Sequence, residues 1–524
     1  MSEGWGIRAG GLMTILRSPL RPIDAFLDRT SMYRLLLYVL LAEVGIAALL
    51  AALGALPFSP LALLLSAGFL VAMCWAANTL LAWVFRISTN AESSIITALI
   101  LALVIDPAKA SAGWEFLGWA AILAMASKFV IGLWGKHIFN PAAIAVVITM
   151  VALGDTASWW VASGAMLPVT LIGGFLIVRK IRQEAMVGVF LLAALLVTCL
   201  ASVVLRLALL GELRTLVVDS PLIFVGSIML TEPLTAPPTQ RLRLIYGALV
   251  GALIVPQAHL GPLYSTPELA LILGNLYSYI VSPKRRLTLR LRKRVRLAPD
   301  ITEFVFRPAQ KLAFAPGQYM EFTLGHPHTD ERGNRRYFTL ASSPTEEQVR
   351  LGVRFYPQGS SFKRALARLD GRSDVLAGQL AGDFTLPQDA SRKLAFIAGG
   401  IGITPFRSML KYLLDTRQQR DIALLYANSA PQDIVYQDVL ADAQTRLGVR
   451  VIYTLTDRAL VPRGWQGAQG RVDERLIAAS IPDYRERAFY LSGPPPMVRT
   501  TEAALHRLGV PRTHIKTDYF PGLT

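Results

Sequence analysis

The sequence is poor in the side chains that bind metals and form disulfides. It has 2 cysteines and 6 histidines among 524 residues. Both cysteines, Cys74 and Cys199, lie inside apolar runs. This excludes a disulfide framework and a [2Fe–2S] cluster held by four cysteines. The sequence therefore predicts no iron–sulfur cluster and no metal site.

Acidic residues are also scarce. Asp and Glu number 36 against 53 Lys and Arg, which gives a net charge of +17. A basic excess can indicate nucleic-acid binding, but here it is concentrated in loops between apolar runs and in the second half. A cytoplasmic membrane face explains part of it, and we expect no nucleic-acid partner. The N-terminus lacks the short apolar core of a cleavable signal peptide.

Long apolar runs dominate the first half of the chain. We count about ten, and several reach the ~20 residues that a bilayer-spanning helix needs. They predict an α-helical polytopic membrane domain over residues 33–283, surrounded by membrane lipids, after a cytoplasmic lead-in at residues 1–32. The runs are roughly 33–55, 61–85, 92–105, 114–133, 139–153, 159–178, 185–207, 218–231, 243–255 and 264–282.

Lys and Arg favour every second loop. With the N-terminus inside, the outer loops near 56–60, 154–158 and 256–263 carry neither residue. The asymmetry follows the positive-inside rule and places the second half of the chain in the cytoplasm. The outer exceptions are Lys109, Arg206 and Arg214.

Two short runs end alike. The run at 92–105 leads into Asp106 and the run at 218–231 leads into Glu232, and each acid precedes a proline. Short segments broken by proline at matching positions of two inverted halves indicate a binding site near the membrane midplane. Acid–proline pairs can equally cap helices at the surface, and both interpretations stay open.

A third motif surrounds Asn140 and reads Gly-Lys-His-Ile-Phe-Asn-Pro-Ala-Ala from residue 135. An Asn cap followed by Pro at the first helical position would also explain it. Together with Gly226–Pro237, it resembles the NqrB/RnfD membrane subunits of bacterial ion-translocating electron-transport complexes, over roughly residues 30–283. The resemblance implies ten helices in two inverted repeats, a multi-pass protein of the bacterial inner membrane, and bound flavin. The membrane-domain candidates are Asp106, Lys136, Asn140, Glu232 and Thr235.

One feature of that family is missing here. Its members carry FMN on the Thr of a Ser-Gly-Ala-Thr type motif, whereas the nearest string in this chain, Ser163–Met166, ends in methionine and lies inside a predicted span. Methionine has no hydroxyl for a phosphoester. We therefore predict no covalent FMN by that chemistry, while a non-covalent FMN or riboflavin between the repeats stays open.

The second half begins with short alternating segments that predict an antiparallel β-barrel over residues 286–388. Its most informative strand begins Arg-Tyr-Phe-Thr at residue 336. Residues two apart in a strand share a face, so Arg336 and Phe338 should point one way, and Tyr337 and Thr339 the other. A cation, an aromatic ring and a hydroxyl at these offsets suit a planar ring system that carries a phosphate.

Two further segments favour phosphate binding. Gly359, Ser360 and Ser361 precede an apparent helix, whose free N–H groups and dipole attract an anion. From 389 to 524 the pattern becomes strand, turn and helix, and a strand runs into Gly399-Gly400-Ile401-Gly402 before a helix near Pro405. This predicts a parallel, nucleotide-binding α/β domain.

These motifs occur in the order typical of the ferredoxin–NADP reductase superfamily, which nearly all of residues 286–524 resembles. The resemblance implies FAD, with Arg336 on its pyrophosphate, Phe338 against the flavin, and Thr339 near the reactive ring nitrogen. Ser492 replaces the family's Cys near the hydride-transfer position, and Phe520 is implied to cover the flavin. The implied catalytic residues are thus Thr339, Ser492 and Phe520. The implied cofactor-binding residues are Arg336, Tyr337, Phe338, Thr339, Ser342, Gly359, Ser360, Ser361, Gly399, Gly400, Gly402, Thr404, Pro405, Gly493 and Pro494.

The resemblance also implies the chemistry. The nicotinamide of NADH or NADPH gives a hydride to FAD, which releases electrons singly. No Arg follows the strand at 422–426 to clamp a 2′-phosphate, which favours NADH. We expect a membrane flavin oxidoreductase that passes electrons through its membrane domain to a quinone or an acceptor across the membrane. An FMN-carrying protein is a plausible partner, and ion movement a plausible coupled process.

Three alternatives were weighed. A ferric-reductase or NADPH-oxidase type enzyme needs paired intramembrane histidines, and the first half holds only His137 and His259, so no haem is expected. A transporter regulated or driven by its reductase half remains open, with Asp106 and Glu232 as its natural test. A reductase merely anchored by its helices is also open, although ten helices exceed what an anchor needs.

Overall fold

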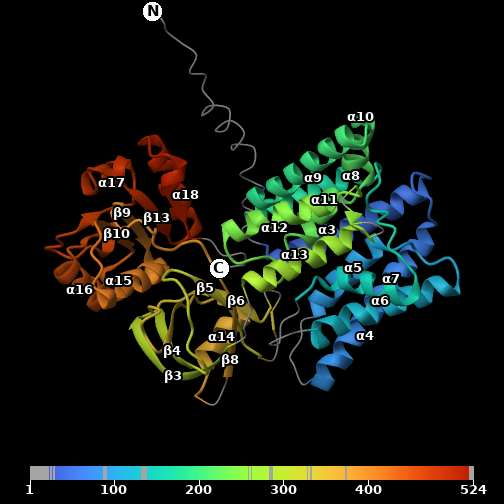
Figure 1. Cartoon of the computed structure of the whole chain (residues 1–524). Helices are drawn as coiled ribbons and strands as arrows, with labels where there is room; N and C mark the ends of the chain where they lie inside the picture. Colours follow the sequence, from blue (N-terminus) through green and yellow to red (C-terminus); the bar gives the residue numbers. More distant parts are fainter. Residues whose placement is uncertain are drawn as a thin grey trace, which may run out of the picture. The chain divides into compact units, whose positions relative to one another are not determined.

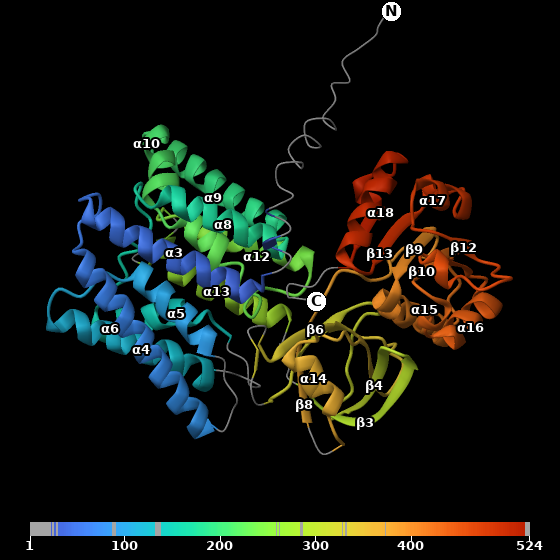
Figure 2. The same ribbon diagram turned by 180° about the vertical axis from the view of Figure 1, so that it is seen from behind.

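The computed structural model describes residues 23, 26–27, 30–85, 91–131, 138–257, 259–260, 263–282, 287–326, 329–330, 333–371 and 374–518. The chain divides into two compact units: unit 1 up to Lys284 and unit 2 from Arg285 to Phe520. Unit 1 is drawn in blue to yellow-green and is built from helices, and unit 2 in yellow to red from two sheets with helices (Figure 1). Figure 2 shows the same elements from behind.

Unit 1 consists of helices and one short hairpin of β1 (His259–Leu260) and β2 (Leu263–Tyr264). Two helix starts show why the chain turns helical there: Ser31 accepts a hydrogen bond from Arg34 N at 3.2 Å, and Asn140 caps α7 before a proline. The helices are α3 (Met32–Ala52), α4 (Pro60–Phe85), α5 (Ala91–Val104), α6 (Ser111–Val130), α7 (Pro141–Leu153), α8 (Leu167–Ile181), α9 (Glu184–Val204), α10 (Leu209–Arg214), α11 (Leu222–Phe224), α12 (Gln240–Leu253) and α13 (Pro267–Val281).

Every apolar run predicted from the sequence contains helix. Within the described part of the chain, three helices are long and apolar enough to cross a membrane: α3, α4 and α9. The run at 218–231 is broken, because Pro221 separates the π-helical segment η2 (Thr215–Asp219) from α11 and a second π-helical segment, η3 (Val225–Met229). The arrangement of ten membrane spans stays a prediction.

The run at 159–178 departs from the sequence interpretation. Helix α8 begins only at Leu167. Trp160 instead docks on the end of α5, where its Nε1 donates to Ala102 O at 3.0 Å. The prediction that Ser163–Met166 lies inside a span is therefore wrong. Hydropathy alone does not reveal that an aromatic residue satisfies the last carbonyls of another helix.

The first sheet of unit 2 is antiparallel, as the alternating pattern predicted, with strand order β6-β5-β8-β3-β4-β7. Its end strands approach each other where Ala341 N donates to Arg350 O at 2.9 Å. The helix of this region packs Phe362 and Leu366 into the sheet's core. The elements are β3 (Leu287–Ala298), β4 (Ile301–Pro308), β5 (Tyr319–Thr323), β6 (Arg335–Thr339), β7 (Val349–Arg354), α14 (Ser361–Arg368) and β8 (Asp374–Ala381).

The second sheet is parallel, as predicted, with order β12-β11-β10-β9-β13-β14. Alternate residues face opposite layers: Phe396 packs with α15 and α16, and Ile397 with α17 and α18. The two helix pairs cover the two faces of the sheet (Figure 1). The elements are β9 (Leu394–Gly399), α15 (Thr404–Thr416), β10 (Ile422–Asn428), α16 (Gln437–Leu447), β11 (Arg450–Leu455), β12 (Ala468–Gln469), α17 (Glu474–Ser480), β13 (Ala488–Ser492), α18 (Pro495–Arg507) and β14 (Ile515–Thr517).

Candidate functional site

Predicted phosphate ligands lie together in the first sheet of unit 2. Arg336, in β6, is buried, and its guanidinium lies 5.6 Å from the ring centre of Phe362. Ser360 caps α14 by accepting a hydrogen bond from Lys363 N at 3.3 Å, and Gly359 forms the turn before it. Ser361 then presents its backbone N–H at the positive end of the helix dipole.

This place already holds an anion, the side chain of Asp330. Asp330 Oδ2 accepts from Ser361 N at 2.7 Å, and Oδ1 lies 3.9 Å from Arg336 Nη2. A guanidinium and a helix N-terminus that together hold a carboxylate also fit the oxygens of a pyrophosphate. Nothing in the sequence pattern pointed to Asp330, because it lies in an irregular loop outside any motif.

The alternation predicted for β6 is confirmed. Phe338 packs on Phe362, as Arg336 does, with ring centres 6.0 Å apart. Tyr337 faces the other way, and its hydroxyl donates to Gln379 Oε1 at 2.7 Å. The Tyr337 hydroxyl is therefore bound within the sheet, and Phe338 packs against the barrel core.

Thr339 and Ser492 come from different sheets and meet at one carboxyl group. Ser492 Oγ donates to Asp518 Oδ2 at 2.9 Å, and Thr339 also hydrogen-bonds to this carboxyl. Burial raises the pKa of Asp518 to about 7, although the two hydroxyl donors act to lower it. Near neutral pH the carboxyl is divided between its protonated and ionised forms, which suits a group that accepts and releases a proton.

Sequence analysis did not identify Asp518 as a site residue. It directly follows β14, the strand beside β13, at the carboxyl edge of a parallel sheet. Ligands of such sheets bind outside this edge, so the end of the last strand was a signal that could have found it. Phe520, predicted to cover the flavin, lies outside the described residues.

The glycine loop after β9 packs directly on the end of β13. Gly400 has φ +52°, which favours glycine. A Cβ atom on Gly402 would lie 2.5 Å from Ser492 O and 2.6 Å from Gly493 N, so a larger residue would push the loop away. The other predicted residues at this edge are Gly399, Thr404, Pro405 and Pro494.

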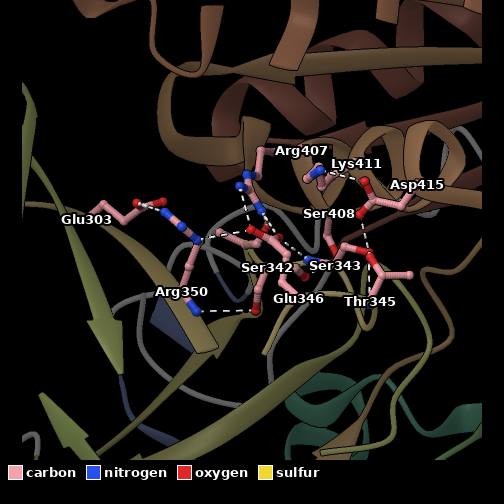
Figure 3. A network of polar contacts seen from close by, with 11 residues as sticks. Glu303, Ser342, Ser343, Thr345, Glu346, Arg350, Arg407, Ser408, Lys411 and Asp415 are labelled. Carbon is pink, nitrogen blue, oxygen red and sulfur yellow. Dashed lines mark hydrogen bonds and ion pairs between the residues drawn. The ribbon is translucent and has the colours of Figure 1, made fainter. Parts of the chain in front are cut away.

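A polar network joins the two sheets of unit 2 (Figure 3). Arg407, on α15, pairs with Glu346 in the loop after β6. Ser408 Oγ donates to Ser342 O at 2.6 Å, and Ser342 Oγ accepts from Arg350 N at 3.2 Å. The contacts of Ser342, a predicted cofactor ligand, are thus with α15 and β7. The network fixes the strand of Arg336 against the helix that follows the glycine loop.

Unit 1 brings together some of its candidates. Asn140 Nδ2 donates to Glu232 Oε2 at 3.0 Å, and Thr235 Oγ1 donates to the same oxygen at 3.3 Å. Asn275, which sequence analysis missed, accepts from Asn140 N at 2.8 Å and donates to Tyr246 OH at 2.9 Å. The two proline motifs around Asn140 and Glu232 therefore form one buried polar cluster.

The remaining membrane-domain candidates are not part of this cluster. Asp106 is exposed and accepts a hydrogen bond from Ser158 Oγ at 2.7 Å. This contact matches the surface-cap interpretation of its acid–proline pair better than a matching role with Glu232. Lys136 lies outside the described residues.

Comparison with known proteins identifies the type of unit 2. The oxidoreductase NAD-binding domain family matches residues 396–503. A glycine betaine monooxygenase reductase subunit of Chromohalobacter salexigens is 25% identical over 227 residues, covering 42% of this chain and 60% of that protein. A flavohemoprotein of Rhodopirellula baltica is 27% identical over 242 residues, covering 44% and 59%. NADH-cytochrome b5 reductase 1 of Ajellomyces capsulatus is 26% identical over 249 residues, covering 45% and 79%.

The chain spans about three fifths of the length of the first two of these relatives. Among solved structures, the cytochrome P450 reductase GcoB of Amycolatopsis is 25% identical, with a TM-score of 0.41 over 45% of this chain and 70% of that one. The chain carries a ferredoxin reductase-like FAD/NAD-binding domain of the NAD(P)H-dependent flavin oxidoreductase type.

Proposed function

Proceeding from a ferredoxin reductase-like domain in unit 2, we propose that the whole chain is a membrane-bound NAD(P)H-dependent flavin oxidoreductase. The observation that carries the proposal is the meeting of Thr339 and Ser492 at Asp518. Thr339 lies on the strand that holds Arg336, and Ser492 adjoins the glycine loop. A flavin bound along the first and a nicotinamide bound along the second would face each other at this carboxyl.

The residues divide the work in a simple way. Arg336 and the N-terminus of α14 bind the pyrophosphate of FAD, and the glycine loop binds that of the nicotinamide nucleotide. Bound flavin supplies the conversion of a hydride into single electrons. Thr339 and Ser492 donate hydrogen bonds, and Asp518 holds or releases the proton that accompanies this change.

The test of the reductase function is direct. The full chain, purified in detergent, is expected to carry FAD equimolar with protein and to oxidise NADH with ferricyanide as acceptor. NADH is expected to be preferred, because β10 ends at Asn428 and no Arg directly follows it to bind a 2′-phosphate. A chain that neither retains added FAD nor oxidises either nucleotide would refute the proposal.

The membrane part of the proposal rests on the surface of unit 1. Apart from Tyr356 and Leu460, all the large apolar side chains found exposed among the described residues belong to residues 26–281. Examples on three helices are Trp83, Ile172 and Leu200, exposed by 76%, 66% and 65%. So much apolar surface is not tolerated in water and matches helices that face lipid, with α3, α4 and α9 as candidate spans.

Electrons then pass from FAD into unit 1 and on to a quinone or an acceptor across the membrane. The Asn140–Glu232 cluster is the proposed place of a non-covalent flavin, because a buried set of amide, carboxyl and phenol groups can hydrogen-bond a flavin ring edge. Met166, where a family relative would carry a threonine, is buried and offers no hydroxyl for covalent FMN.

A flavin census separates this path from the alternative, an anchored reductase. Acid precipitation of the purified full chain should release FAD together with a second flavin, and Glu232→Ala should lose only the second. FAD alone would favour the anchored reductase. Flavin retained on the precipitated chain would show a covalent attachment that Met166 cannot make.

A further inference from the structure

A buried carboxyl group in unit 1 lies outside the cluster just described. Glu43 is 0% exposed and sits in the middle of α3, one of the three helices able to cross a membrane. Among the described residues, neither of its carboxylate oxygens has a hydrogen-bond partner, and no charged group acts on it. An acid inside a membrane helix is costly and usually functional.

Two other buried acids of unit 1 provide the contrast. Glu268 accepts a hydrogen bond from Trp159 Nε1 at 3.0 Å and lies in the first turn of α13, where the helix dipole favours an anion. Glu232 accepts hydrogen bonds from Asn140 and Thr235. Glu43 has neither kind of support, so its ionised form would be an uncompensated buried charge.

The packing around Glu43 leaves little to separate it from α8. A Cβ atom on Gly173 would lie 3.6 Å from Glu43 Oε1, and one on Gly174 would lie 2.4 Å from Ser227 Oγ. Glu43 and Ser227 therefore lie against adjacent glycines of one helix. Ser227 belongs to the π-helical segment η3, and Thr231 Oγ1 donates to its carbonyl at 2.8 Å. Such segments often mark functional sites.

We propose that Glu43 is a proton-binding site of unit 1. Its carboxyl group carries a proton in the resting protein, releases it as a proton to water to leave a carboxylate, and takes it up again, with no electron transferred. The neutral form removes the cost of an unpaired charge, and the small residues of α8 leave the carboxyl room to turn. The titratable groups on α3 and on the helices packed against it are Tyr33, Arg34, Tyr38, Cys74, Glu92, Arg179 and Lys180, and none of them acts on Glu43.

The purpose of the exchange, though not the site itself, rests on the proposed function. An electron that enters unit 1 adds negative charge to a medium of low dielectric constant, where charges interact strongly. A proton bound at Glu43 would offset part of that charge. The proton site can be tested without any electron transfer.

Infrared spectroscopy of the full chain in lipid nanodiscs tests it. At a pH well above the titration of Asp518, the protein should show the C=O stretching band of a protonated carboxyl group, and this band should shift in D₂O. The band should be lost in Glu43→Gln, shifted in frequency in Glu43→Asp, and unchanged in Glu268→Gln, the matched variant of a partnered buried acid.

Retained FAD content and ferricyanide reduction would show that the Glu43 variants are folded. Wild-type and Glu43→Gln spectra that are identical in the carboxyl region would overturn the proposal. A band that does not shift in D₂O would overturn proton exchange, and one that sodium ions remove at constant pH would identify a metal-cation site instead. Absence of a second flavin would refute the electron path but leave the infrared result intact.

Discussion

Asp518 is the side chain at which the two sheets of the reductase converge. It receives hydrogen bonds from Ser492 and Thr339, and burial raises its pKa from the ordinary 3.8 to about 7. Because the native state binds this proton more tightly than the unfolded chain, the stability it contributes is complete below about pH 4 and is lost as the pH rises to about 7. The same titration controls the proton available beside the flavin.

Asp518→Asn should therefore flatten the pH dependence of stability between about pH 4 and 7. It should also remove the activity change centred near pH 7, because an amide cannot exchange this proton. Denaturant midpoints followed by flavin fluorescence, and NADH–ferricyanide rates across the same pH values, measure both effects. Asp389→Asn is the control, since a hydrogen bond from Ser391 lowers the pKa of Asp389 and its effect falls below this window. A variant with the wild-type pH profiles would contradict the role given to Asp518.

Arg336 is the second residue with a specific expected effect. Arg336→Ala should weaken FAD binding about 10- to 100-fold, because a hydrogen bond to a charged group contributes roughly 1.5–3 kcal/mol. Asp330→Asn should strengthen FAD binding, since the carboxylate now beside Arg336 and Ser361 competes with phosphate. Titration of the FAD-free protein with FAD measures both. Equal affinities in Arg336→Ala and wild type would move the pyrophosphate elsewhere.

Helix α15 determines where the glycine loop stands relative to β6. Arg407 is 5% exposed and pairs with Glu346, whereas Lys411 and Asp415 form a more exposed pair on the same helix. Arg407→Met should destabilise unit 2 by about 3–5 kcal/mol because it leaves a buried charge unpaired. Lys411→Met should cost less than about 1 kcal/mol. Denaturant unfolding of the holoprotein compares them, and a double variant with Glu346→Gln should recover part of the loss. Similar losses in both single variants would show that burial of the pair has no effect.

The glycine loop itself is constrained by close approach. Gly402→Ala would place its Cβ 2.5 Å from Ser492 O, so the loop must shift away from β13 and nicotinamide-nucleotide binding should weaken. Gly371→Ala is the control, because its nearest listed neighbour would be at 3.8 Å, an ordinary contact. KM for NADH and FAD content separate a loop effect from unfolding. A normal KM in Gly402→Ala would show that the loop does not hold the nucleotide.

At the scale of the whole molecule, a helical unit with an apolar surface is joined to a water-soluble reductase. With unit 2 in the cytoplasm, inside-out membrane vesicles should oxidise NADH at once, while right-side-out vesicles should do so only after permeabilisation. Ferricyanide reduction measures this latency, and an established cytoplasmic-facing NADH dehydrogenase calibrates the vesicle orientation. Equal rates in both preparations would reverse the topology derived from the basic loops.

Local patterns were enough to predict most elements of unit 2. The strand at 301–306, the strand around Arg336 and the helix near Pro405 are all present, because side-chain alternation and glycine turns depend on neighbours in the chain. The site was predicted less completely. Asp330 and Asp518 escaped notice because a single acid in a loop or after a strand carries no pattern of its own.

The sequence by itself determined the two kinds of unit, the antiparallel and parallel sheets, and the motifs that suit FAD and a nicotinamide nucleotide, since these follow from periodicity and short-range turn chemistry. Only the tertiary structure decided which side chains meet. It joined Thr339 to Ser492 through Asp518, placed Ser342 in the contact with α15, and brought Asn275 to Asn140. It also left Glu43 buried without a partner. Such contacts depend on how distant segments pack, and the free energies of packing, burial and hydrogen bonding act between residues that are far apart in the sequence.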